Sequence, residues 1–281
     1  MGVWLRLSSH GHIDLPNPWS RPMSVTYTLE SHVARVTIDR PDRMNAVDLA
    51  TEKELIRIWE AIETDRDVRV VVLTGAGDRA FCTGADMKGG DSGLSGLEYW
   101  AAARPGGFGG IALRDTLDVP VIARVNGHAL GGGMEMVLGC DIVVASEKAT
   151  IGLPEPRVGR LALDGGIAML TRRIPHVHAM GMLLTGRRIA AHEAHALGLV
   201  NEVVAPDALD EAVARWVDGV LACAPLSVRA IKAMVRAGEG MSAKEAQMLR
   251  LPQLVEALQS TDQNEGVKAF QEKRQPVWSG R

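Results

Sequence analysis

The stretch Asn126-Gly127-His128-Ala129-Leu130-Gly131-Gly132-Gly133-Met134-Glu135 joins two segments of different character. The apolar run 119–125 before it predicts a buried strand, and the residues after the three glycines predict the first turns of a helix. Glycines at such a joint let backbone N–H groups approach a ligand without a Cβ in the way. The first N–H groups of a helix also lack partners within the helix and lie at its partly positive end. The stretch is therefore suited to hold an oxygen that carries negative charge.

The same stretch ends in a carboxylate, because Glu135 lies about one turn into the predicted helix. An anion-stabilising backbone beside an acid/base group indicates chemistry at a carbonyl group. On local sequence alone, a tight strand-to-helix turn followed by a solvated Glu135 explains the residues as well. The decision between the two interpretations depends on the rest of the chain.

The composition and cysteine spacing of the chain argue against several classes of function. The formal net charge is −3 over 281 residues, and aromatic residues make up 4%, so neither a basic nor a base-stacking surface for nucleic acid is indicated. No apolar run reaches the 18 or more residues of a membrane span. Three cysteines without zinc-like or C-x-x-C spacing predict a reducing, cytoplasmic setting and no metal site.

The order of predicted elements indicates an α/β protein in three parts. Residues 1–23 are rich in His, Ser and Pro and are expected to form a flexible tail. Residues 24–205 are expected to form a β/α core, and residues 206–281 a helical region. The patterns predict strands at 33–38, 68–73, 119–125, 141–146 and 199–204, and helices at 48–63, 97–103, 179–184, 190–197, 209–222, 226–237, 243–251 and 264–273.

Several short motifs occur one after another along the chain. They are Phe-Cys-x-Gly-Ala-Asp-x-Lys at 81–88, Pro-x-Ile-Ala-x-Val-Asn-Gly at 120–127, Ala-Leu-Gly-Gly-Gly-x-Glu at 129–135, Cys-Asp-Ile at 140–142, Gly-x-Pro-Glu at 152–155, Leu-Thr-Gly-x-x-Ile-x-Ala at 184–191 and Gly-Leu-Val at 198–200. Together they resemble the enoyl-CoA hydratase/isomerase family, also called crotonases, over roughly residues 25 to 275. The resemblance implies a spiral of β-β-α units with a helical C-terminal trimerisation region.

The resemblance also implies a site. Crotonases stabilise the enolate of an acyl-CoA thioester with two backbone N–H groups, which by motif correspond to Ala85 and Gly132. In the hydratases of the family two glutamates handle water and protons, and Glu135 and Glu155 stand at those positions. By family analogy Glu135 acts mainly as the base that holds water, and Glu155 as the acid at C2. Two close carboxylates are expected to titrate as a coupled pair.

Further residues enter through the same resemblance. The CoA portion is expected to lie along Ala85, Asp86, Met87 and Lys88, while Phe270 and Lys273 resemble positions that contact CoA, sometimes from a neighbouring subunit. For Lys273 a solvated helix charge remains an equal alternative. Homotrimers or homohexamers are expected, with coenzyme A as part of the substrate and no other cofactor.

The chain also departs from the hydratase pattern. Where many hydratases carry Pro-Gly-x-Gly-Gly, the stretch here is Leu161-Ala162-Leu163-Asp164-Gly165-Gly166. Asp164 is expected to be a structural cap, or alternatively an extra proton carrier that moves the chemistry toward isomerisation. The Gly-rich insertion 89–110 is expected to shape the acyl pocket.

The leading functional prediction is an enoyl-CoA hydratase. The alternatives are another crotonase reaction, such as isomerisation or the dehydration of a specialised acyl-CoA, and a non-catalytic CoA- or RNA-binding homologue. The two glutamates favour the hydratase, and the absence of a basic patch in the sequence disfavours RNA binding.

Overall fold

The computed structural model describes residues 24–87 and 96–281. The expected tail 1–23 and Lys88 lie outside the described residues, as does the first part of the insertion. Within the described parts of the chain, no helix is both long and apolar enough to cross a membrane.

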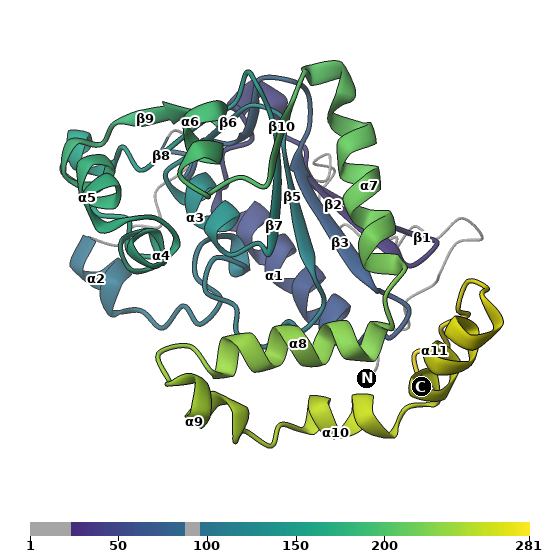
Figure 1. Ribbon diagram of the computed structural model, residues 1–281. Helices are drawn as coiled ribbons and strands as arrows, with labels where there is room; N and C mark the ends of the chain where they lie inside the picture. Colours follow the sequence, from purple (N-terminus) through teal and green to yellow (C-terminus); the bar gives the residue numbers. More distant parts are fainter. Residues whose placement is uncertain (1–23, 88–95) are drawn as a thin grey trace, which may run out of the picture.

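Two sheets form the body of the molecule (Figure 1). The larger sheet has six strands, in the spatial order β1 (Val25–Glu30), β2 (Val33–Ile38), β3 (Val70–Gly75), β5 (Val121–Val125), β7 (Ile142–Ser146) and β10 (Glu202–Val204). The smaller sheet has four, in the order β4 (Ala80–Cys82), β6 (His128–Leu130), β8 (Thr150–Gly152) and β9 (Arg188–Ala190). From β2 onward the pairs of the larger sheet are parallel, whereas β1 pairs with β2 in the antiparallel sense.

The chain passes repeatedly from the larger sheet to the smaller one and then into helix. The steps β3 to β4, β5 to β6 and β7 to β8 each make this passage, and α3 (Gly132–Leu138) follows the second. This alternation confirms the expected α/β spiral of β-β-α units. It also brings the ends of β4, β6 and β8 side by side, because these three strands pair in parallel.

The apolar run of β3 explains why the larger sheet is covered on both faces. Val71 and Leu73 point into the main core, while Val70 and Val72 point into a second cluster under α7 (Leu209–Leu221). A strand buried on both sides reads as continuous rather than alternating hydrophobicity. Figure 1 shows α7 on one face of this sheet and α1 (Leu49–Thr64) on the other.

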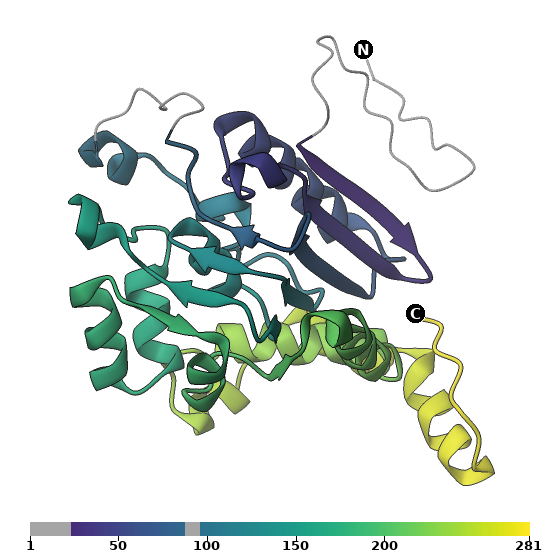
Figure 2. The same cartoon turned by 90° about the horizontal axis from the view of Figure 1, so that it is seen from above.

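The remaining helices lie at the two ends of the molecule (Figures 1 and 2). Near the smaller sheet are α2 (Gly96–Ala101), α4 (Gly166–Arg173), α5 (His176–Thr185) and α6 (Ala191–Ala196). The C-terminal group contains α8 (Pro225–Ala237), α9 (Ala243–Gln247), α10 (Pro252–Gln259) and α11 (Thr261–Glu272). In this group α8 and α10 run alongside each other, and both views show α11 at the opposite end of the molecule from α2 and α4.

Several predicted boundaries were wrong. The helix expected at 243–251 ends at Gln247, because Leu251 precedes Pro252 and takes an extended conformation that helix geometry does not allow. The helix expected at 97–103 runs from Gly96 to Ala101, and the strand expected at 68–73 lies at 70–75. Among the described residues, five strands and two helices were not predicted, namely β1, β4, β6, β8, β9, α4 and α10.

Candidate active site

Three consecutive glycines at the start of α3 each meet a different physical demand. Gly131 has φ 57° and ψ −130°, a backbone conformation that residues with a Cβ rarely adopt. A Cβ on Gly132 would lie 2.6 Å from the Phe108 ring, and one on Gly133 would lie 2.0 Å from the carbonyl oxygen of Cys82. The triplet therefore lets α3 begin in close contact with the segments on either side of it.

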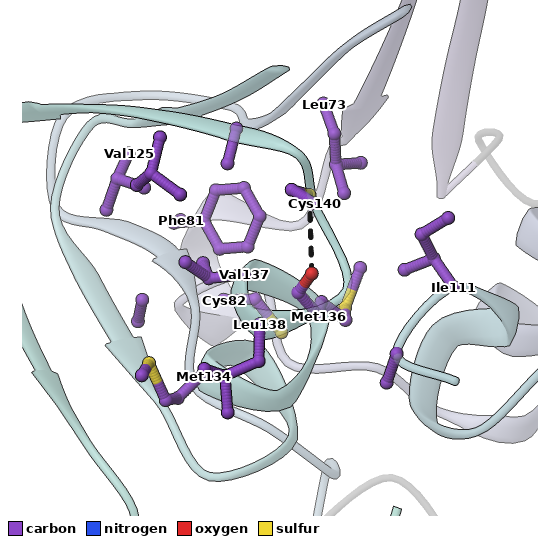
Figure 3. Packing of buried hydrophobic residues seen from close by; sticks show 14 of the residues in the cluster. Leu73, Phe81, Cys82, Ile111, Val125, Met134, Met136, Val137, Leu138 and Cys140 are labelled. Carbon is purple, nitrogen blue, oxygen red and sulfur yellow. Dashed lines mark hydrogen bonds between the residues drawn. The ribbon is translucent and has the colours of Figure 1, made fainter. Parts of the chain in front are cut away.

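The helix that follows the glycines is buried on every side. Figure 3 shows Met134, Met136, Val137 and Leu138 packed among core residues near Phe81. All residues of α3 are buried, so the helix is held by packing although it has only seven residues. Burial of each large apolar side chain contributes ~1.5–3 kcal/mol to stability. This packing fixes the direction in which Glu135 points.

The second backbone segment is the chain from Cys82 to Ala85, which lies beside the start of α3. A Cβ on Gly84, whose φ is 90°, would lie 3.1 Å from the backbone nitrogen of Gly132. Val47 bridges to this segment by accepting from Asp86 N and donating to the Gly84 carbonyl, both at 2.9 Å. In a parallel bridge of this kind the N–H of the intervening Ala85 points away from Val47. The structure thus brings Ala85 and Gly132, the two residues expected to form the oxyanion hole, onto adjoining backbone.

Glu135 is buried, with 4% of its surface exposed. Its Oε1 accepts a hydrogen bond of 2.9 Å from the backbone N–H of Gly166 at the start of α4. The pKa of Glu135 is raised to about 8, mainly by burial and in addition by the charges of Asp164 and Glu155, against the lowering effect of the Gly166 N–H. A carboxyl with this pKa is mostly protonated at neutral pH in the free protein.

Glu155 begins the short 3-10 helix η3 (Glu155–Val158) after β8. A Cβ on Gly131 would lie 3.2 Å from Glu155 Oε1, so the carboxyl group lies directly against the first glycine of the triplet. Burial raises its pKa. Its Oε2 is buried and has no hydrogen-bond partner within residues 24–87 and 96–281. A buried oxygen of this kind is costly unless something polar reaches it.

Asp164 does not cap a helix, so the expectation of a structural cap was wrong. The N-cap of α4 is Gly165, which has no side chain to accept hydrogen bonds from the free N–H groups. The buried Asp164 carboxylate instead accepts a short hydrogen bond from the Tyr99 hydroxyl and one of 3.3 Å from Arg104 Nε. The insertion that contains Tyr99 and Arg104 is thereby fixed to the start of α4.

The predicted CoA-contacting residues fall into two groups. Met87 is 72% exposed beside Ala85, whereas the Asp86 carboxylate accepts from Arg40 at 2.9 Å and is mostly buried. Phe270 is 83% exposed on α11, and Lys273 caps the end of that helix. Because α11 lies away from α2, α3 and α4 in both views, the folded chain does not bring these two residues to its own glutamates (Figures 1 and 2).

The sequence placed residues 104–110 in the insertion expected to shape the acyl pocket but did not reveal their individual contacts. Phe108 lies against Gly132, and Trp59 donates a hydrogen bond of 2.9 Å from Nε1 to the Gly109 carbonyl. Glu52 of α1 accepts from Arg104 Nη2 at 2.5 Å. The only signal in the sequence was a run of glycines, and that signal does not reveal which side chains the run brings together.

Two adjoining backbone segments lie beside one buried and one partly buried carboxyl group, an arrangement suited to acid/base chemistry at a carbonyl group. A family model for enoyl-CoA hydratase/isomerase matches residues 28–281. The chain belongs to this family.

Similar proteins agree with that assignment. The chain is 41% identical to the (E)-benzylidenesuccinyl-CoA hydratase of Thauera aromatica, over 92% of this chain and 100% of the relative. It is 37% identical to the carnitinyl-CoA dehydratase of Proteus mirabilis, over 92% of this chain and 99% of the relative. The solved enoyl-CoA hydratase of Bacillus anthracis superposes with a TM-score of 0.84 at 32% identity, covering 92% of this chain and all of that one. These relatives make the chain an acyl-CoA enzyme of the crotonase family.

Proposed function

We propose that the protein is an enoyl-CoA hydratase, which adds water across the 2,3 double bond of a 2-enoyl-CoA thioester. The observation that carries the proposal is the buried Oε2 of Glu155, which has no hydrogen-bond partner among the described residues and belongs to the same site as the buried Glu135. Hydration needs two such groups, since a hydroxyl is added at C3 and a proton at C2.

In the proposed mechanism the thioester oxygen accepts hydrogen bonds from the N–H groups of Ala85 and Gly132. Negative charge moves onto this oxygen as hydroxide adds to C3, and the fixed N–H groups stabilise the resulting enolate. One such donor contributes ~100- to 1000-fold to the rate. As the first residue of α3, Gly132 has an N–H without a carbonyl partner in its own helix.

The pair of glutamates supplies the proton transfers. One carboxylate must be ionised to take a proton from water, and the other must be protonated to deliver one to C2. Burial raises the pKa of both, so that the pair retains a proton near neutral pH. Because the pKa of Glu135 is about 8 in the free protein, the assignment of Glu135 as the base requires that it loses its proton when enoyl-CoA binds.

Isomerisation has less support than hydration. An isomerase in this fold would use an extra proton carrier, and Asp164 was the candidate for it. Its carboxylate is instead occupied by Tyr99 and Arg104. Dehydration of a 3-hydroxyacyl-CoA is the same reaction in reverse, and the similarity to a carnitinyl-CoA dehydratase favours this second candidate. Both named relatives act on substituted acyl groups, and we propose the same for this chain.

A panel of CoA thioesters tests the proposal. Linear, branched and aryl-substituted 2-enoyl-CoAs are followed by loss of the conjugated-thioester absorbance, and products are identified by mass and by the position of the new oxygen. The wild type should form 3-hydroxyacyl-CoA from at least one substituted substrate. Glu135→Gln and Glu155→Gln should each lower kcat/KM by ~100- to 10,000-fold. Glu239→Gln, at an exposed ion pair with Arg172, serves as the matched control.

Two outcomes would refute the proposal. Near-wild-type rates in both glutamine variants would rule out the pair as proton carriers. A product with a shifted double bond and no added oxygen would make the protein an isomerase.

The remaining assignments are part of the same proposal. CoA runs along the backbone at 85–88, and Phe270 and Lys273 reach the CoA of a neighbouring subunit in a trimer or hexamer. The protein works in the cytoplasm without a further cofactor or a nucleic acid. Light scattering of the purified protein measures the oligomeric state, and a monomer with full activity would remove Phe270 and Lys273 from the site.

A further inference from the structure

The insertion reaches the catalytic region through a cluster of four polar side chains. Tyr99 and Arg104 both donate to the Asp164 carboxylate, and the Arg104 guanidinium lies 4.5 Å from the centre of the Tyr99 ring. Arg104 also pairs with Glu52 of α1 at 2.5 Å. The side chains of Asp164 and Glu52 are 8% and 12% exposed, so water screens these interactions only weakly.

Asp164 is connected to Glu135 through the turn 164–166 and one hydrogen bond. It precedes Gly165 and Gly166, and the N–H of Gly166 holds Glu135 Oε1 at 2.9 Å. The backbone of Asp164 also favours the ionised form of Glu135, while its carboxylate opposes that form. One residue therefore affects both the orientation and the charge of the catalytic carboxyl group.

We propose that Asp164 is a positioning residue for Glu135, and that Tyr99 and Arg104 hold it in place from the insertion. The hydrogen bonds to Asp164 fix the turn 164–166, and this turn fixes Glu135. The negative charge of Asp164 favours the protonated form of Glu135. The catalytic meaning of this arrangement rests on the proposed function, whereas the coupling between the two carboxyl groups does not.

The charges around Glu135 make the direction of the effect definite. Asp164 before the start of α4 and Glu155 on η3 act on it as like charges, and Arg104 pairs with both Asp164 and Glu52. Burial and the hydrogen bond to Asp164 raise the pKa of Tyr99, so its hydroxyl remains a donor across the working pH range. Removing the charge of Asp164 leaves Glu155 as the remaining like charge and stabilises ionised Glu135.

The test is a titration of Glu135 in the substrate-free protein by difference infrared spectroscopy. The C=O stretch of protonated Glu135 is identified by its loss in Glu135→Gln. Asp164→Asn keeps the shape but removes the charge, and should lower the titration midpoint of Glu135 by about half to one pH unit. Its kcat should fall ~10-fold with little change in KM, because CoA binding is untouched.

The variant Tyr99→Phe tests the position of Asp164 separately from its charge. It leaves the Asp164 charge in place, so the midpoint should stay unchanged while kcat falls a few-fold, at about the cost of one lost hydrogen bond. Arg172→Gln on α4 is the control, since its ion pair is exposed and its loss should change neither quantity.

The outcomes distinguish the two hypotheses. A wild-type midpoint in folded Asp164→Asn overturns the inference even if the enzyme hydrates enoyl-CoA. A lowered midpoint in a protein without hydratase activity supports the inference and refutes the proposed function. If Asp164→Asn does not fold, Tyr99→Phe decides, and wild-type kcat in that variant overturns the inference.

Discussion

The backbone around Gly132 and the side chains around Glu135 lie one helical turn apart, but the first region depends on close packing and the second on ionisable groups. In the first region, Gly132 lies against the Phe108 ring and Gly133 against the backbone of Cys82. The second region contains the carboxyl groups of Glu135, Asp164 and Glu155, and the latter two act on the charge of Glu135. Added bulk in the first region should therefore impair activity equally at every pH. The second region should tolerate conservative changes in shape, and its properties should depend on pH.

The largest effect should come from adding bulk to the first region. Gly132→Ala places a Cβ 2.6 Å from the Phe108 ring, so the ring or the helix start must move. Because reacting groups tolerate little displacement, kcat/KM should fall ~100-fold or more at every pH. Steady-state kinetics with an active enoyl-CoA measures the loss.

A companion variant sharpens the interpretation. Gly132→Ala combined with Phe108→Leu relieves the contact and should recover part of the activity. Gly181→Ala, where a Cβ meets nothing within 4 Å, is the control. Full activity of Gly132→Ala alone would mean that the close packing has no part in shaping the hole.

The next effect concerns pH in the second region. The pKa of Glu135 is about 8 in the folded state, above the ordinary value of 4.5 for a glutamate. Between these values the unfolded chain loses the proton while the folded protein keeps it, so this group lowers stability as pH rises. Glu135→Gln should match the wild type near pH 4 and exceed its free energy of unfolding by on the order of 2–4 kcal/mol at pH 8. Urea unfolding at both pH values measures the difference, and an equal difference at both would contradict the raised pKa.

The smallest effect should come from the hydrogen bond that attaches the 104–110 segment to α1. Trp59→Phe removes the hydrogen bond from Nε1 to Gly109 and should cost ~1 kcal/mol in unfolding free energy. The activity should fall only a few-fold, since Phe108 and Arg104 keep their other contacts. An unchanged stability would show that this hydrogen bond does not hold the 104–110 segment.

The sequence predicted the two regions unequally. Ala85 and Gly132 were identified through motifs that resemble those of the family, and the parallel pairing of β4 and β6 in the structure explains how they come together. Glu155 was found through its motif as well. The environment of Asp164 was misjudged, because its partners Tyr99 and Arg104 are 60 or more residues away in a segment without periodicity. Periodicity reports burial within an element and carries no information on such distant polar pairs.

The secondary structure shows the same division. Long apolar or amphipathic segments such as β2 and α7 were predicted to within a residue. The strands of the smaller sheet have three residues each, too few for an alternating pattern to be recognised, and β4 and β6 were missed for that reason. These short strands nevertheless position the site, since β6 leads directly into α3.

The segment 104–110 also limits how this enzyme can be redesigned. Its Phe108 lies on Gly132, its Arg104 holds Asp164, and its Gly109 is attached to α1. A graft that exchanges the whole insertion 89–110 for that of a relative would therefore alter the surroundings of Gly132, Asp164 and α1 together. A graft that keeps Tyr99 and residues 104–110 would leave these contacts in place, because Tyr99 also donates a hydrogen bond to Asp164.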